Sequence, residues 1–275
     1  MPGWLESFLK GPFVAAGNAV WEWLMNITMG TMVQTPENFS PDTWIYVTDT
    51  LYPWVLTIGV SMVNVFFILS FFKAVSNIKE NITLELCVEA MMKLVVLNVL
   101  MVKGMDIFST IFSMSSAMVN QISQTTSFTP FTGEADLGAG IFGWSVGPLY
   151  FLVAAVCGVM ILITVYSRYI KLYAMMVFYP LAMPTLIGGH GIDGTAYAWI
   201  RQFLSVAFEI VAIALVMAIS GSIISHIQPA FDGNGWFSNI FDGFAQMFAT
   251  CVYMILMTTA VKGAANLMNK TFNLH

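Results

Sequence analysis

The feature that most constrains this chain is its series of long apolar runs, the clearest of which, residues 147–167, contains no charged side chain. Three further runs, largely apolar, cover residues 46–72, 203–224 and 244–261. A helix needs about 20 predominantly apolar residues to cross the hydrocarbon core of a bilayer. Hydrocarbon offers no hydrogen-bond partner, so backbone N–H and C=O groups must pair within the segment. Each run therefore predicts a membrane-spanning helix.

The composition supports a membrane environment for most of the chain. Of its 275 residues, 58% are hydrophobic and only 9% are charged, whereas a soluble domain carries about 25% charged residues. Continuous apolar runs favour helices over a transmembrane barrel, which is built from short segments of alternating polarity. We therefore expect an all-α, polytopic membrane protein.

Residues 82–120 show a helical pattern whose apolar centre lies between Lys93 and Lys103, which predicts a fifth span over about 94–118. We expect one continuous helix here, and its charged residues then fall on one side, forming a polar stripe that must face protein or water. The stripe consists of Glu85, Glu89, Lys93, Lys103 and Asp106. Lys103 and Asp106 stand three residues apart, so they either neutralise each other or line a polar lumen or subunit interface.

A sixth apolar run, residues 172–188, is long enough to span, but Pro180 and Pro184 interrupt its backbone hydrogen bonding. If this run is a re-entrant or interfacial segment, the charges follow the positive-inside rule, with the N-terminus outside and the C-terminus inside. The loops 121–146 and 226–243 contain no Lys or Arg and would lie outside. The cations placed inside are Lys73, Lys79, Lys93, Arg168, Lys171, Arg201, Lys262 and Lys270.

The N-terminal segment, residues 1–45, precedes the five-span membrane domain of residues 46–275. Its apolar residues recur at helical spacing, and Trp4, Trp21 and Trp23 are candidate interfacial anchors. We expect an extracytoplasmic amphipathic helix that either lies on the membrane surface or packs as a short helix on the bundle.

Catalysis is not expected, because the chain has no HExxH, GxSxG or Walker motif and its three histidines are scattered. No catalytic, cofactor-binding or metal-binding residue is predicted. Glu209 is a lone acid within an apolar run, and intramembrane charges are by default functional candidates. It either pairs with Lys103 or an inner-loop arginine, or acts in a proton relay.

Two blocks, residues 71–101 and 167–220, together with the N-out, C-in arrangement of five spans, resemble the TrbL-like polytopic subunit of type IV secretion and conjugation machines. The second block carries the family's order of features: a basic residue after a span, an apolar Pro-containing stretch, a Gly-rich turn and another span. The resemblance implies a homo-oligomeric, pentameric ring in the cytoplasmic membrane of a bacterium. It also implies association with secretion ATPases and passage of single-stranded DNA with its relaxase.

On this reading, the inner-loop cations are the candidate electrostatic surface for the DNA strand or acidic partners. They are Lys73, Lys79, Arg168, Lys171 and Arg201. The alternative is that these cations only orient the protein in the membrane. Two other functions stay open: a secondary transporter or ion channel in which Lys103, Asp106 and Glu209 form a midplane site, and a membrane-permeabilising protein.

Overall fold

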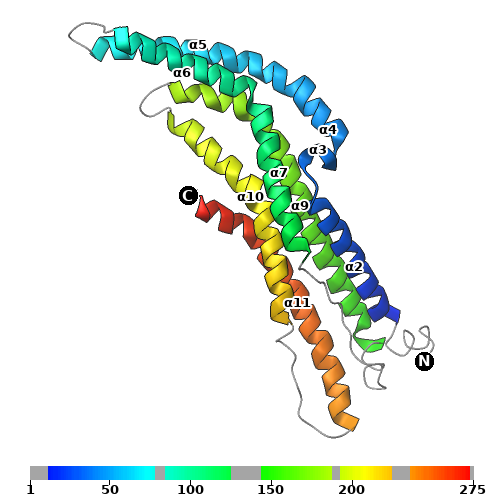
Figure 1. The fold of residues 1–275 in the computed structure, drawn as a ribbon. Helices are drawn as coiled ribbons and strands as arrows, with labels where there is room; N and C mark the ends of the chain where they lie inside the picture. The colour runs from blue at the N-terminus through cyan, green and yellow to red at the C-terminus, as the bar shows by residue number, and fades with distance from the viewer. Residues whose placement is uncertain (1–11, 78–83, 125–143, 188–192, 225–235, 273–275) are drawn as a thin grey trace. The chain divides into compact units, whose positions relative to one another are not determined.

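The computed structural model of the protein describes residues 12–77, 84–124, 144–187, 193–224 and 236–272. These residues are almost entirely helical and include no strand, so the predicted all-α class is confirmed for them. The elements are α2 (Pro12–Met32), α3 (Pro36–Phe39), α4 (Pro41–Ile45), the π-helix η1 (Tyr46–Leu51), α5 (Tyr52–Asn77), α6 (Leu84–Val102), α7 (Gly104–Ser123), α9 (Gly147–Ala182), the 3₁₀ turn η2 (Met183–Ile187), α10 (Asp193–Ile224) and α11 (Trp236–Thr271) (Figure 1).

Within the described residues, four helical stretches are long and apolar enough to cross a membrane: Pro41–Phe72, Gly147–Ile187, Gly194–Ser222 and Met247–Thr271. A fifth is added if Met91–Val102 and Gly104–Ser123 form one bent span. These helices fit a multi-pass membrane protein. The predicted spans 46–72, 94–118 and 147–167 fall within these stretches or within the bent pair, and the predicted spans 203–224 and 244–261 overlap them except for two or three residues at one end.

Helix α9 is longer than the sequence indicated. The predicted span ended at residue 167 and was followed by a Pro-broken segment, but α9 continues to Ala182, two residues past Pro180. A proline removes one helical hydrogen bond, and here the loss does not end the helix at once. Gly59 of α5 lies so close to the Pro180 carbonyl that a Cβ at this position would overlap it. The helix gives way to the 3₁₀ turn η2, which contains Pro184.

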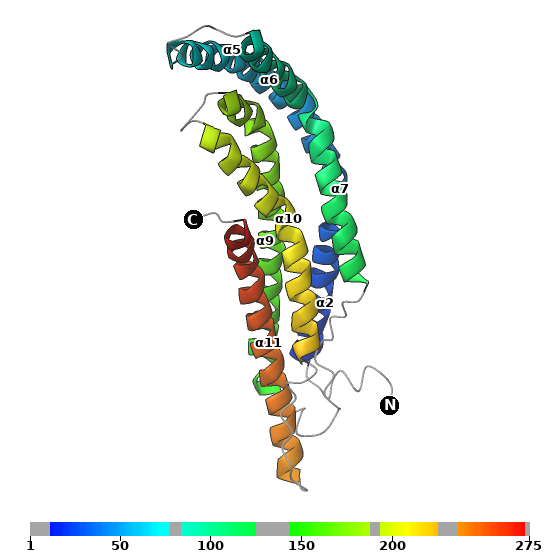
Figure 2. The same cartoon turned by 60° about the vertical axis from the view of Figure 1, so that its left-hand side comes forward.

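The chain divides into two compact units, and helices α7, α9, α10 and α11 each contribute residues to both. Unit 1 comprises Met1–Val33, Ala117–Ser167 and Ile210–Leu267, and unit 2 comprises Gln34–Ser116, Arg168–Glu209 and Met268–His275. In unit 2, α5 and α6 lie side by side, as Figure 2 shows.

In unit 1, helix α2 lies along the first half of α9, and the two helices run in the same direction. Phe13 approaches Gly147, Gly17 approaches Tyr150, and further along Leu24 approaches Gly158. The Tyr150 hydroxyl also hydrogen-bonds the Asn18 side chain at 2.5 Å. Of the two expectations for the N-terminal segment, this packing favours a helix docked on the bundle.

The tryptophans of this segment differ from the prediction in one case. Trp23 is exposed, as an interfacial anchor would be, but Trp21 is only 1% exposed. Because α2 turns its Trp21 side towards the protein interior, this residue packs in the core instead of anchoring at an interface. Trp4 lies outside the described residues.

We expect Gly17→Ala to destabilise the protein. Its Cβ would stand 2.8 Å from the Tyr150 ring and 3.3 Å from the Phe151 Cα, and overpacking of this kind costs about 1–3 kcal/mol. The thermal unfolding midpoint in detergent should fall by about 2–4 °C for each kcal/mol. Gly30→Ala, in the same helix but with no atom within 4 Å of its added Cβ, is the control. Equal midpoints for the two variants would show that α2 does not pack closely on α9.

Candidate functional site

The candidate site is the break between α6 and α7, where Lys103 separates two helices bent by 58°. Figure 2 shows the chain turning at this point. The prediction of one unbroken helix over residues 82–120 was therefore wrong. The predicted polar stripe does not continue through the break, because the residues before and after Lys103 belong to helices that point in different directions.

Two tyrosines from distant parts of the sequence hydrogen-bond to the end of α6. The last four carbonyl groups of a helix have no partner within it, and in a membrane water cannot substitute. Here the Tyr179 hydroxyl donates to the Leu100 carbonyl at 3.1 Å. The Tyr52 hydroxyl donates to the Met101 carbonyl at 2.5 Å. The two hydroxyl groups thus satisfy carbonyls that the break would otherwise leave unpaired.

Gly104, the first residue of α7, makes room for both tyrosines. A Cβ on this residue would lie 2.5 Å from Cε1 of Tyr179 and 2.8 Å from the hydroxyl oxygen of Tyr52. Any larger side chain would displace one of the rings from its carbonyl. The break therefore depends on a glycine at this position.

An aromatic cluster holds Tyr179 in place. The Phe108 ring lies 4.9 Å from the Tyr179 ring and 4.7 Å from the Phe203 ring, measured between centroids. Trp199 stacks on Phe203 and lies 5.2 Å from Tyr179. Aromatic pairs at such distances are favourable beyond the area they bury. The cluster thereby joins α7, the end of α9 and the start of α10 within unit 2.

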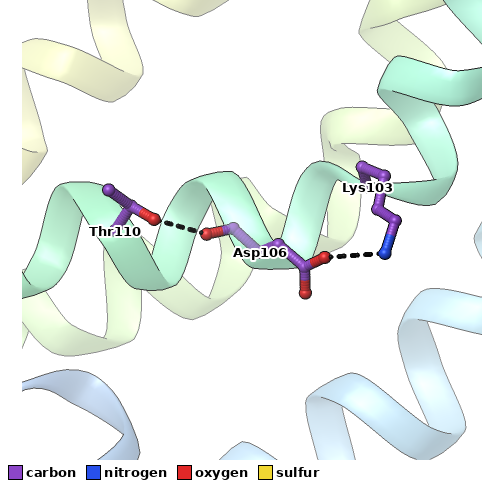
Figure 3. Close-up of polar contacts among 3 residues, drawn as sticks. All are labelled: Lys103, Asp106 and Thr110. Carbon is purple, nitrogen blue, oxygen red and sulfur yellow. Dashed lines mark hydrogen bonds and ion pairs between the residues drawn. The ribbon is translucent and has the colours of Figure 1, made fainter.

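On the exposed side of the break, Lys103 and Asp106 form the predicted ion pair (Figure 3). The Lys103 ammonium lies 3.1 Å from a carboxylate oxygen of Asp106, and the two side chains are 66% and 71% exposed. Lys103 follows the C-terminus of α6, and Asp106 is in the first turn of α7. Each charge therefore has the sign that the adjacent helix dipole favours.

A row of polar side chains continues from this pair along α7. Asp106, Thr110 and Ser113 are all exposed and follow one another at spacings of four and three residues. The Thr110 hydroxyl donates to the Asp106 carbonyl at 2.9 Å (Figure 3), and the Ser113 hydroxyl donates to the Ser109 carbonyl at 2.8 Å. These two hydroxyl groups are satisfied within the helix, but the charged Asp106 is costly in hydrocarbon, so its end of the row must meet water or protein.

Glu209, the other predicted intramembrane acid, lies inside unit 2, only 3% exposed. The positive charges of Arg168 and Lys171 attract its carboxylate. Of the predicted partners, the structure thus places the inner-loop arginine near Glu209, while Lys103 pairs with Asp106. The three residues proposed for a midplane site therefore include one ion pair at the surface and one buried acid.

Arg168 was predicted to lie on a cytoplasmic surface, but it is buried, only 2% exposed. Its guanidinium donates to the Val206 carbonyl at 3.1 Å and to the Ala207 carbonyl at 2.9 Å, both on α10. Arginine is suited to such a site, since its planar group offers five donors.

Of the remaining predicted cations, Lys171 and Arg201 are exposed. The side chain of Lys73 and the whole of Lys79 lie outside the described residues. Of the five cations predicted to form an electrostatic surface, two therefore have side chains that the structure describes and shows to be exposed. Both belong to unit 2.

Sequence reasoning missed Tyr52, Gly104 and Tyr179. An isolated glycine in a helical pattern, here directly after Lys103, is a known sign of a special backbone position. No local sequence pattern identifies the two tyrosines, because their rings are largely apolar and each residue lies in an apolar run.

Comparison of the chain with protein-family models, with curated proteins and with solved structures found no match. Within the described part of the chain, no three His, Cys, Asp or Glu side chains are grouped so that they could hold a metal ion. The properties of the site therefore rest on its own geometry: a fixed break in an apolar helical segment, capped on one side by tyrosines and carrying an exposed ion pair on the other.

We expect Tyr52→Phe and Tyr179→Phe each to lower the stability of the detergent-solubilised protein. Each change removes the donor to a carbonyl that is buried for Tyr52 and partly buried for Tyr179, and a buried polar group left without its partner costs about 1–3 kcal/mol. Thermal unfolding followed by circular dichroism measures the effect. Tyr46→Phe, at a tyrosine that is 54% exposed, is the control. If all three variants unfold at the same temperature, the two hydroxyl groups do not stabilise the break.

Proposed function

We propose that this chain is a channel or scaffold subunit of a conjugative type IV secretion machine in the cytoplasmic membrane of a bacterium. In this role it is not an enzyme and uses no cofactor. It supports the passage of single-stranded DNA and the attached relaxase across the membrane. The observation that carries the proposal is the exposed Lys103–Asp106 pair in the bent apolar segment.

Charged side chains are costly inside a membrane. One Lys or Asp at the centre of a spanning helix raises the free energy of insertion by about 2.5–3.5 kcal/mol. Pairing at 3.1 Å offsets part of this cost, but both side chains remain more than half exposed. A water-filled lumen or a neighbouring subunit would supply the missing polar surroundings, and a transport machine provides both.

The proposed topology has five spans, with the N-terminus outside and the C-terminus inside. They are residues 46–72, 94–118, 147–167, 203–224 and 244–261, the second being the bent pair of α6 and α7. This arrangement keeps the Lys- and Arg-free loops outside, as the positive-inside rule requires.

The proposed assembly is a pentameric homo-oligomer that works with secretion ATPases. In such a ring every copy presents the same α7 face, from Asp106 to Ser113, to the lumen or to its neighbour. Five copies would repeat one short polar face around a closed ring, as closed symmetry requires of identical subunits.

The resemblance of residues 71–101 and 167–220 to the TrbL-like family is what specifies conjugation among transport functions. The second block contains Lys171 and Arg201, which are exposed. Cations on the inner side could meet the phosphates of the strand or acidic subunits electrostatically.

We expect the double variant Lys103→Leu/Asp106→Leu to reduce conjugative transfer at least tenfold while the protein still inserts at the normal level. Removing both charges leaves no unpaired one behind, so insertion should not suffer, but the polar face is lost. Transfer of a marked conjugative element from donor cells that carry only the variant measures the effect. Val102→Leu/Ile107→Leu, which changes two neighbouring exposed apolar residues, is the control.

Two outcomes separate the site from the function. Normal transfer by Lys103→Leu/Asp106→Leu would exclude a role for the ion pair. Normal transfer by donor cells that lack the chain altogether would refute the proposed function itself.

We further expect Lys171→Gln/Arg201→Gln to lower transfer about tenfold with unchanged membrane insertion. Loss of two positive charges weakens attraction of an anionic strand or an acidic partner. Lys262→Gln/Lys270→Gln, which removes two other exposed cations of the proposed inner face, controls for net charge. Equal transfer by both variants would leave the cations with only an orienting role.

One observation favours a second candidate, a secondary transporter. Transporters build midplane sites from discontinuous helices, and the break at Lys103 has this form. A purified monomer that takes up a small solute into vesicles would support the transporter, whereas a ring that copurifies with an ATPase would support the secretion subunit.

A further inference from the structure

An open groove with a volume of about 730 Å³ lies within unit 2, between α6, η2 and α10. Its volume is within the range typical of ligand pockets, about 300–1,000 Å³. Most of its wall is apolar. The lining includes Met92, Val96, Leu100, Leu186, Ile187 and Tyr197.

The polar part of the wall includes an ion pair near the start of the lining stretch of α6. The Lys93 ammonium lies 2.6 Å from a carboxylate oxygen of Glu89, and the two side chains are 65% and 63% exposed. Both residues line the groove. The hydrogen bond from Lys93 lowers the pKa of Glu89, so this carboxyl group stays ionised at neutral pH. One end of the groove thus presents a fixed positive and a fixed negative charge.

The part of α6 that lines the groove is about as long as one leaflet of a bilayer is thick. Along α6, Glu89 and Leu100 are eleven residues apart, which corresponds to about 16 Å at the helical rise of 1.5 Å per residue. The hydrocarbon core is about 30 Å thick, so one leaflet contributes about 15 Å. If Glu89 and Lys93 lie at the level of the lipid headgroups, just before the proposed span of residues 94–118, the apolar wall up to Leu100 lies within the same leaflet.

We propose that this groove binds one phospholipid with a zwitterionic headgroup, its acyl chain along α6 and its headgroup on the Glu89–Lys93 pair. Lys93 would bind the phosphate, and Glu89 would bind the ammonium group, so both charges of the headgroup have a partner of opposite sign. Tyr197, half-exposed beside the groove, has an apolar ring and a polar hydroxyl, which suits it to the headgroup boundary. This site does not depend on the proposed function in secretion.

Native mass spectrometry of the protein in mild detergent tests the apolar part of the site. Val96 lines the groove, whereas its neighbour Val95 does not, and both are about equally exposed, at 62% and 58%. We expect the wild type and Val95→Trp to retain one phospholipid, and Val96→Trp to retain at least fivefold less. Equal retention by the two variants would overturn the proposal. A protein dimer that Val96→Trp disrupts and Val95→Trp does not would also overturn it, because a second copy of the chain would then close the groove.

The headgroup is tested by exchange of lipids on the purified protein. The wild type should retain phosphatidylethanolamine at least threefold better than the anionic phosphatidylglycerol. Glu89→Gln should reverse this preference, because it removes the partner of the ammonium group, and Lys93→Gln should weaken retention of both lipids. A wild type that prefers phosphatidylglycerol, or a preference that Glu89→Gln leaves unchanged, would refute a zwitterionic site. Unchanged thermal unfolding of Glu89→Gln and Lys93→Gln, whose side chains are exposed, shows that any loss of lipid is local.

Discussion

The bend between α6 and α7 depends on two hydrogen bonds, those from the hydroxyl groups of Tyr52 and Tyr179 to the carbonyls of Met101 and Leu100. A helix that breaks in water can hydrate its free carbonyls, but a helix that breaks in hydrocarbon must find donors within the protein. Tyrosine is suited to this because its ring packs like any apolar side chain while its hydroxyl reaches the backbone. The sharp change of direction at Lys103 can therefore exist without water on its inner side.

The same break determines where charge can be placed. It creates a helix C-terminus and a helix N-terminus a few residues apart, and Lys103 and Asp106 occupy the ends whose dipoles favour them. In an unbroken helix neither charge would gain this stabilisation. The tyrosines stabilise the buried side of the break, and the break in turn stabilises the ion pair on its exposed side. The proposed polar face therefore depends on the whole break and not on the ion pair alone.

Much of the fold could be predicted from the sequence, since the apolar runs marked the helices and the three-residue spacing of Lys103 and Asp106 indicated their pairing. The break could not, because the partners that stabilise it are 49 and 79 residues away from the carbonyls they bind. The burial of Arg168 was missed for a related reason. The positive-inside rule assigns cations to the inner loops from sequence alone. It cannot identify an arginine that donates its hydrogen bonds to carbonyls of another helix, as Arg168 does. The extension of α9 past Pro180 likewise depends on α5, which offers a glycine where the proline carbonyl approaches.

Arg168 and Lys103 illustrate two ways in which an apolar helix keeps a cation. Arg168 is enclosed, and backbone carbonyls of α10 accept its hydrogen bonds, so unit 2 alone provides its partners. Lys103 has three N–H donors and Asp106 has two acceptor oxygens, yet the contact between them uses only one donor and one oxygen. The remaining polar capacity belongs to side chains that are 66% and 71% exposed, and hydrocarbon cannot satisfy it. A cation of the first kind is satisfied by the fold itself, whereas a pair of the second kind requires water or protein around it, and that requirement is the physical basis of the proposed assembly.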